Sequence, residues 1–221
     1  MVWGGIQAVY YRDRSDAGRR LAELLVTYRS ENPLVLAMPR GGVVVGYEIA
    51  HALNAPLDVL VARKLGVPDN PEFAFGAIGP GGVRYLNERV VAMLGLDEAD
   101  IEAAISAETK ELNRRMHAYR GDMPQGDFSG RTIILVDDGL ATGATARAAI
   151  LSVKQHRPRR IILAVPVSPV DTAEALRDEV DELICPVIQA DFYAIGQWYD
   201  NFDQTSDEEV QDLLARASKA A

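Results

Sequence analysis

The fold of this chain is decided by the stretch Ile133-Ile134-Leu135-Val136-Asp137-Asp138-Gly139-Leu140-Ala141-Thr142-Gly143-Ala144-Thr145. Four β-favouring apolar residues lead into two adjacent carboxylates, and a loop of small and hydroxyl residues then precedes a helical stretch from Ala146 to Val153. This pattern predicts a buried strand, a turn and the start of a helix. Open α/β sheets bind their ligands at the carboxyl ends of their strands, so we expect Asp137 and Asp138 to lie at a ligand site.

The loop that follows the two acids is suited to binding a phosphate. It opens a helix, and the free N–H groups and positive dipole end of a helix N-terminus attract anions. Two carboxylates one loop away can accept hydrogen bonds from ring hydroxyls, so the two features together indicate a site for a phosphorylated sugar. The alternative is an ordinary strand-to-helix turn in which Asp137 or Asp138 only caps the helix.

At these residues the chain resembles the type I phosphoribosyltransferases. Their signature is an apolar strand, two acidic residues, two variable apolar positions and a small-Thr-Gly-x-Thr/Ser loop, and every position matches except Gly139, where the family usually has a larger apolar residue. The resemblance implies that Asp137 and Asp138 hold the ribose 2′- and 3′-hydroxyls of phosphoribosyl pyrophosphate (PRPP). The residues that would bind its 5′-phosphate are Ala141, Thr142, Gly143, Ala144 and Thr145.

A second strand end, Met38-Pro39-Arg40-Gly41-Gly42-Val43, also leads through a tight turn into a helix. Glycines let backbone N–H groups approach an anion closely, and an arginine adds a charged fork suited to phosphate oxygens. In the family that the chain resembles, the loop after the first core strand binds the pyrophosphate leaving group, and Arg40, Gly41 and Gly42 fall in that place. A plain glycine turn with an exposed arginine is the alternative.

The stretch Ala62-Arg63-Lys64-Leu65-Gly66-Val67-Pro68 resembles the segment that precedes a mobile catalytic loop in adenine-type members of the family. Either Lys64 or Arg63 could neutralise the charge that builds up on departing pyrophosphate. Residues 66–75 are predicted to form a lid, because glycine and proline punctuate them and the acids Asp69 and Glu72 keep them solvated. Alternatively, the basic residues are simply exposed at a strand end.

Five aromatic residues lie within residues 192–202 of a chain that is only 7% aromatic. The stretch resembles the hood of hypoxanthine-guanine members, in which an aromatic residue three positions before a glycine stacks on the base and an aspartate four positions after it helps to hold the metal. The matching positions are Tyr193, Gly196 and Asp200, with Trp198 as a competing stacking residue. The alternative is a small satellite core under a loop.

One position conflicts with that hood. Hypoxanthine-guanine members carry an aspartate, their candidate general base, where this chain has Ala141. The Ala-Thr-Gly sequence at this place looks more like the adenine and uracil types. The acceptor base and the general base therefore stay open.

The composition narrows the choice of partners and compartment. Among 221 residues, 32 acids outnumber 23 bases, and the net charge of -9 argues against binding to nucleic acid or to an anionic membrane surface. The densest basic cluster, Arg157, Arg159 and Arg160, is interpreted as a solvated loop and strand edge. Cys185 is the only cysteine, and the chain has neither a signal pattern nor an apolar run of transmembrane length, so we expect a cytoplasmic location.

The order of predicted elements gives the fold class. Alternating strands and helices predict an α/β fold with a doubly wound, mostly parallel sheet and helices on both faces, the type I phosphoribosyltransferase fold. We expect one domain over residues 1–221 with a hood at about 186–204. The predicted elements are helices beginning near Ser15, Val43, Asp171 and Ser206, strands at Leu34–Met38, Leu57–Ala62, Ile161–Val167 and Glu182–Ile184, and a hairpin of Phe75–Ile78 with Val83–Leu86.

A mostly helical insertion is expected at about residues 87–125, where many family members have less chain. Its main helix is predicted from Glu98 to Tyr119, with Gly121 as its stop. The charged residues on this helix are either solvated i,i+3 and i,i+4 pairs or groups that close over the site. They are Glu108, Glu111, Arg114 and Arg115.

The resemblance implies a Mg²⁺-dependent phosphoribosyltransferase that acts on PRPP and a small heterocyclic acceptor. Homodimers are common in the family, so the resemblance also implies a possible homodimer. The catalytic residues would be Arg40, Lys64, Asp137 and Asp138, and the metal would be held by Asp137, Asp138 and Asp200. The alternative is a regulatory protein of the same fold that senses PRPP and transfers nothing, for which the missing general base is an argument and the acidic charge a counter-argument.

Overall fold

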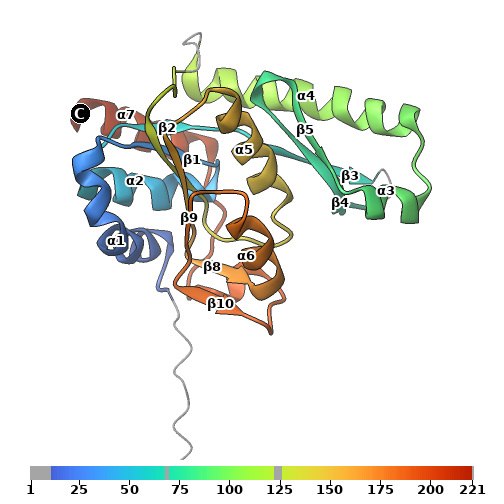
Figure 1. The fold of residues 1–221 in the computed structure, drawn as a ribbon. Coiled ribbons are helices and arrows are strands. Elements are labelled where there is room, and N and C mark those ends of the chain that lie inside the picture. The colour runs from blue at the N-terminus through green and yellow to red at the C-terminus, as the bar shows by residue number, and fades with distance from the viewer. Residues whose placement is uncertain (1–10, 68–69, 122–125, 221) are drawn as a thin grey trace, which may run out of the picture.

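The computed structural model describes residues 11–67, 70–121 and 126–220 (Figure 1). Within these ranges a five-stranded parallel sheet forms the centre, in the strand order β2-β1-β6-β7-β9. Its strands are β1 (Leu34–Ala37), β2 (Leu57–Val59), β6 (Thr132–Val136), β7 (Arg160–Ala164) and β9 (Glu182–Ile184). The predicted α/β class with a mostly parallel sheet is confirmed.

Helices cover both faces of this sheet, as predicted. Because side chains alternate along a strand, Val35 of β1 faces α1 (Arg14–Leu25) and α2 (Gly41–Leu53), and Leu36 faces the opposite core. That second core is closed by α5 (Ala144–Gln155) and α6 (Val170–Arg177). The signature strand β6 is buried along its whole length between the two layers, so the acids after it have a rigid support.

An arm extends from the main body and appears at the right of Figure 1. We use the name for the antiparallel sheet β3-β4-β5 and the helices α3 and α4. Their bounds are Arg63–Val67 for β3, Asn70–Gly79 for β4, Val83–Leu86 for β5, Glu88–Leu94 for α3 and Glu98–Arg120 for α4. The predicted hairpin is confirmed, and a turn at Pro80–Gly82 joins its strands.

One sequence prediction in this region was wrong, because the strand expected at Leu57–Ala62 ends at Val59. The described residues of the expected lid belong to the paired strands β3 and β4, and their closure over the site stays a prediction. Apolar residues of the arm, including Leu65 and Phe75, are buried in a core that α4 covers, which holds these strands together. Pro68 and Asp69 lie outside the described residues, as do the side chain of Glu72 and the expected end of the insertion at Gln125.

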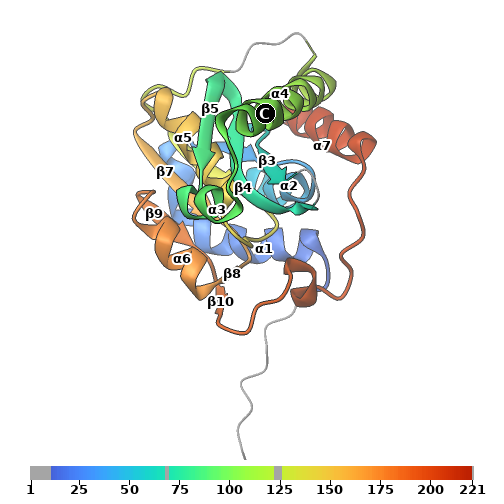
Figure 2. The same cartoon turned by 90° about the vertical axis from the view of Figure 1, so that its right-hand side faces the viewer.

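Helix α4 follows its predicted pattern closely. Asp97 and Asp100 form a capping box at its start, and Gly121, at a φ of 60°, ends it. The apolar side chains of α4 pack against β3, β4 and α7 (Asp207–Ala220), and Leu112 and Tyr119 are buried in the shared core. Helices α4 and α7 lie side by side in both views (Figures 1 and 2).

The hood lies at the opposite end of the molecule, at the bottom of Figure 2. It contains β8 (Val167–Pro169), β10 (Val187–Gln189) and the short helix η3 (Ile195–Trp198). The single strand expected at Ile161–Val167 was therefore wrong. Val165 still donates to the carbonyl of Ile184, but Pro166 has no N–H to continue the ladder, and the chain leaves the main sheet for the hood.

Two helix starts were predicted from capping residues. At α7 the Oγ of Ser206 accepts from the N–H of Glu209 at 3.1 Å, as expected. At α1 the cap is Asp13, which accepts from the N–H of Asp16 at 2.7 Å, and not Ser15. Among the residues that the structure describes, none of the helices has the length and apolar character needed to cross a membrane.

Candidate functional site

The two signature acids follow β6 directly, at the carboxyl edge of the sheet. Asp137 Oδ1 accepts from the N–H of Asp138 at 2.8 Å. Burial, and after it the neighbouring Asp138 carboxylate, raises the pKa of Asp137 well above its ordinary value. Two carboxylates in one buried place repel each other, so the pair is arranged to accept hydroxyl donors or a cation.

The loop after β1 runs against these acids. The N–H of Met38 donates to the carbonyl of Val136 at 2.8 Å, which aligns the two strand ends. A Cβ at Gly42 would lie 2.9 Å from both Asp137 Cα and the Val136 oxygen, and one at Gly41 would lie 1.9 Å from Asp138 Oδ2. Gly41 and Gly42 therefore allow the loops after β1 and β6 to come into contact. In the same loop, the peptide bond between Pro39 and Arg40 is cis.

Arg14 is a residue of this site that sequence reasoning missed. Its Nε donates to Asp138 Oδ2 at 2.7 Å, and the two side chains are only 12% and 13% exposed. The same guanidinium donates through Nη1 to the carbonyl of Asp203 at 2.7 Å and lies 3.8 Å above the ring of Phe202. Tyr199 adds a 2.6 Å bond from its hydroxyl to the Asp138 carbonyl. Asp138 is thus held in place by Arg14 of α1 and by Tyr199, which directly follows η3.

The predicted phosphate loop leads into α5. Gly143 is the N-cap at a φ of 74°, a conformation that favours glycine, and the Oγ1 of Thr172 donates to the Ala141 carbonyl at 2.7 Å. Ala141 and Thr142 are exposed. The first N–H groups of a helix have no partner within the helix. At the start of α5, that of Ala144 donates to Thr142 Oγ1 at 3.5 Å.

Gly139, the one departure from the family signature, touches the hood. A Cβ there would lie 2.6 Å from Ile195 Cγ2 and 3.0 Å from Val167 Cγ1. The place of the larger apolar residue is therefore filled by the side chain of Ile195.

The predicted cations lie on the side of the site that faces the arm. Arg40 pairs loosely with Asp207 at 3.9 Å, and Arg63 pairs with Glu108 of α4 at 2.7 Å. Lys64 is exposed and has no carboxylate partner among the described residues. A cavity of about 680 Å³ opens here, lined by both Arg63 and Lys64.

The predicted base-stacking aromatics have different surroundings. Tyr193 is 92% exposed, whereas Trp198 is 6% exposed and packs in a satellite core with Tyr11 and Tyr199. The backbone N–H of Asp200 donates to Tyr11, and no group of three or more metal-ligating side chains exists in the described ranges. The structure therefore does not bring Asp200 together with the two signature acids.

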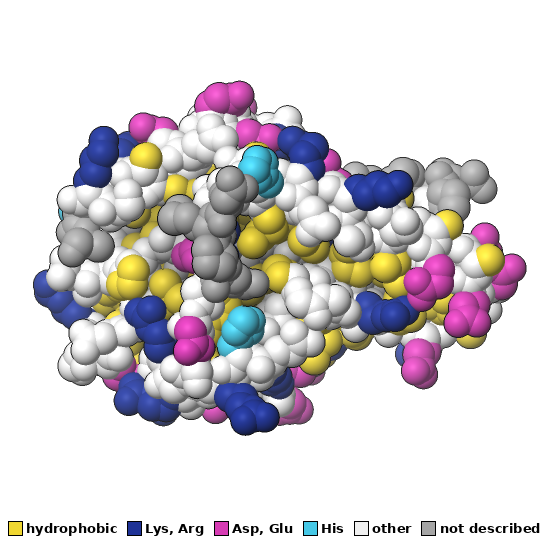
Figure 3. Space-filling model, turned by 90° about the horizontal axis from the view of Figure 1, so that it is seen from above, with side chains coloured by type: hydrophobic (Ala, Val, Ile, Leu, Met, Phe, Trp, Pro, Cys, Tyr) yellow, Lys and Arg dark blue, Asp and Glu magenta, His cyan; other side chains and the backbone are white. Residues whose placement is uncertain are grey.

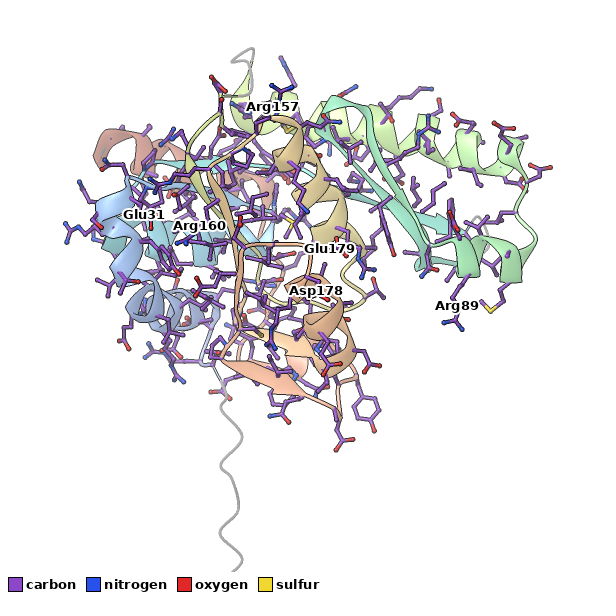
Figure 4. The ribbon with its side chains drawn as sticks, in the orientation of Figure 1. Glu31, Arg89, Arg157, Arg160, Asp178 and Glu179 are labelled. Atoms are coloured by element: carbon purple, nitrogen blue, oxygen red, sulfur yellow. The ribbon has the colours of Figure 1, made fainter. Side chains whose placement is uncertain are left out.

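Two members of the basic cluster share one acid. Arg159 and Arg160 both pair with Glu31, at 2.5 and 3.4 Å, and Figure 4 shows Glu31 and Arg160 near each other. On the face shown in Figure 3, Lys and Arg side chains alternate with Asp and Glu around the rim instead of forming one basic patch. This distribution offers no basic stripe for a nucleic-acid backbone on that face.

The comparisons with known proteins agree with this geometry. A family model described as the phosphoribosyl transferase domain matches residues 11–200. The chain belongs to this family. A protein of Mycobacterium tuberculosis (strain ATCC 25618 / H37Rv), named "Putative phosphoribosyl transferase Rv0571c", is 47% identical over 209 residues, which are 95% of this chain and 47% of that protein. The chain thus spans about half the length of the curated relatives it matches.

Two solved structures share the fold of this chain. The crystal structure of the TT1426 protein from Thermus thermophilus has a TM-score of 0.78 and 40% sequence identity, and the match covers 94% of this chain and 98% of that one. The AQ2163 protein from Aquifex aeolicus, at a TM-score of 0.51 and 11% identity, covers 91% of this phosphoribosyl transferase domain and 84% of its own chain. The second likeness concerns the fold alone.

Proposed function

We propose that this chain is a Mg²⁺-dependent phosphoribosyltransferase, which transfers the 5-phosphoribosyl group of PRPP to a nitrogen of a nucleobase-like acceptor and releases pyrophosphate. One observation carries the proposal: the loops after β1 and β6 touch through Gly41 and Gly42, so a helix start and a pair of acids share one strand edge. A helix N-terminus can bind the phosphate of a sugar ester, and the neighbouring acids can accept hydrogen bonds from its hydroxyls.

Each part of PRPP has a proposed partner. Asp137 and Asp138 accept the ribose hydroxyls, and residues 141–145 bind the 5′-phosphate through backbone N–H groups and the hydroxyls of Thr142 and Thr145. The phosphate is remote from the reacting carbon, so its binding energy serves to hold the sugar in position. Arg40, Gly41 and Gly42 face the diphosphate.

A magnesium ion fits this donor set. Mg²⁺ prefers oxygen ligands and is usually held by one or two carboxylates together with substrate phosphates and water. Asp137 and Asp138 provide two carboxylates whose mutual repulsion a cation would relieve, in accordance with the raised pKa of Asp137. When bound, the ion supplies positive charge beside the diphosphate. Asp200 is left out of this set because it stands apart from the pair.

The reaction replaces one bond at C1′ by another. The C1′–O bond breaks and the electron pair leaves with pyrophosphate. The acceptor nitrogen forms the new bond to C1′ and passes its proton to water. Lys64 and Arg40 stabilise the leaving charge, which is the effect that usually dominates such steps. We propose Tyr193, rather than the buried Trp198, as the aromatic residue available to an acceptor ring.

Pyrophosphate release in the presence of PRPP, Mg²⁺ and a panel of free purines and pyrimidines tests the proposal. Pyrophosphate release with any one base supports the transferase activity. The Asp137→Asn variant should no longer release pyrophosphate. Tight PRPP binding without turnover across the panel would instead favour a PRPP-sensing regulator. Absence of both binding and turnover would overturn the proposal.

A further inference from the structure

The cavity beside the proposed diphosphate position is closed on one side by the insertion helix. Its volume of about 680 Å³ falls within the range of small-molecule sites. Pro39 from the β1 loop and Thr145 from the phosphate loop form one side of the lining, and α4 forms another. Along α4 the lining residues Ala103, Ala104 and Ala107 are small, which leaves the space between helix and β3 open.

The charges in this cavity come from both walls. Arg63 and Lys64 of β3 and Arg115 of α4 contribute positive charge, and Asp100 and Glu108 of α4 contribute negative charge. Arg63 and Glu108 are bonded at 2.7 Å across the cavity, with about a quarter of each side chain exposed (26% and 28%). One cation of β3 is therefore occupied by an acid of the insertion.

Arg115 and its neighbour Arg114 offer an internal comparison. Both bond to Glu111 at 2.7 Å, but Arg115 is 22% exposed and lines the cavity, whereas Arg114 is 57% exposed and lies outside the lining. The two arginines share a helix and an acid partner. They differ in access to the cavity.

A second contact joins α4 to the β1 loop. The hydroxyl of Tyr119 donates to Asp207 Oδ1 at 2.5 Å, and Asp207 in turn pairs with Arg40. Arg40, which is assigned to the leaving group, and Arg63, which lines the cavity, are thus paired with acids that belong to α4 or are held by it.

We propose that α4 is a wall of the diphosphate chamber, that Arg115 is one of its binding residues, and that Glu108 competes with the diphosphate for Arg63. This inference rests on the proposed function and adds a binding residue from a segment that the family signature does not include. The ligand is a diphosphate, either that of PRPP or released pyrophosphate. Planar guanidinium forks match the geometry of phosphate oxygens.

Calorimetry with magnesium pyrophosphate, and separately with PRPP and with ribose 5-phosphate, tests the inference. Arg115→Ala should weaken pyrophosphate binding about tenfold or more, as expected for one lost charge-assisted hydrogen bond, and leave ribose 5-phosphate binding within about twofold. The matched variant Arg114→Ala should leave both unchanged. Equal losses in the two arginine variants would overturn the assignment of Arg115.

A substitution of Glu108 should change the pyrophosphate affinity in the opposite direction. Glu108→Gln should tighten pyrophosphate binding severalfold, because it frees Arg63 and removes a negative charge from the cavity. The control is Glu102→Gln. Glu102 lies on α4, like Glu108, but it forms an exposed pair with Arg84 of β5, so this variant should leave pyrophosphate binding unchanged. Weaker or unchanged binding in Glu108→Gln would overturn the competition, whatever the fate of Arg115→Ala. Wild-type protein that binds none of the three ligands would overturn the proposed function itself.

Discussion

The two sides of the site to which we assign the ribose and the diphosphate, called the ribose side and the diphosphate side below, are held in different ways. On the ribose side, Asp138 is nearly buried, accepts from Arg14, and packs against the β1 loop where a Cβ would not fit. On the diphosphate side, Lys64 is exposed and Arg63 is paired across an open cavity with a helix of the arm. The first side is fixed by the central core, and the second is built on strands outside the main sheet (Figure 1).

This difference predicts which substitutions should change both stability and activity, and which should change ligand binding alone. A preorganised acid pair offers its hydrogen bonds without reorganisation, so changes there should affect both folding and catalysis. Exposed cations contribute little to folding, and changes there should affect ligands alone. The following predictions test that separation.

The largest effect is expected on the ribose side. Asp138→Asn should lower turnover by about two to three orders of magnitude, because it removes a charged acceptor of the ribose hydroxyls. The free energy of unfolding should fall less, by about 1–2 kcal/mol, since the amide oxygen still accepts from Arg14. Steady-state kinetics and urea unfolding measure the two quantities. Equal losses in both would contradict the role given to Asp138.

Arg14→Gln should come next, with a loss of about 3 kcal/mol in the free energy of unfolding, because it leaves a nearly buried carboxylate without its cation. The control is Arg19→Gln on the same helix, where the arginine is 47% exposed and pairs with Glu48 at 3.1 Å. Its cost should stay below about 1 kcal/mol. Similar urea midpoints for the two variants would show that the Arg14–Asp138 pair stabilises the fold no more than an exposed pair on the same helix does, and would contradict the view that the ribose side is part of the core.

Lys64→Gln should separate ligand effects from stability. We expect turnover to fall about tenfold or more and the free energy of unfolding to change by less than about 0.5 kcal/mol, because the side chain is exposed and lacks a carboxylate partner among the described residues. Kinetics and thermal unfolding on the same sample check this. A stability loss as large as that of Arg14→Gln would show that the arm side is as integral to the core as the ribose side.

The smallest effect concerns pH. The pKa of Asp137 is raised in the folded protein, mainly by burial. The folded state therefore keeps a proton that the unfolded state releases, and this contribution to stability is complete in acid and is lost as pH rises through the raised pKa. Asp137→Asn should be more stable than wild type at neutral pH, and the gain should shrink as pH falls from the raised pKa toward the ordinary aspartate pKa and be absent below it. A gain that grows in acid would contradict the sign.

The sequence predicted the central sheet well for physical reasons. Apolar runs such as 133–136 report burial on both faces, and local capping patterns such as Ser206 with Glu209 report helix starts. Both signals are carried by residues near each other in the chain. The break at Pro166 was missed because the apolar run continues past it, although the residues after it belong to the hood.

The contacts that shape the site could not be predicted in the same way. Arg14 and Asp138 are 124 residues apart, and nothing in the pattern around Arg14 distinguishes it from other arginines of an amphipathic helix. The pairing of Glu108 with Arg63 depends on how the insertion helix packs on β3, which the i,i+4 spacing of its charges does not encode. Pairing between distant segments requires the tertiary arrangement.

The contact between Gly139 and Ile195 sets how closely the hood approaches the strand end that carries the two acids. A Cβ at position 139 would lie 2.6 Å from Ile195 Cγ2 and 3.0 Å from Val167 Cγ1. An alanine there would therefore have to displace η3 or Val167. On the proposed function, the missing methyl group also helps to set the room left for an acceptor ring.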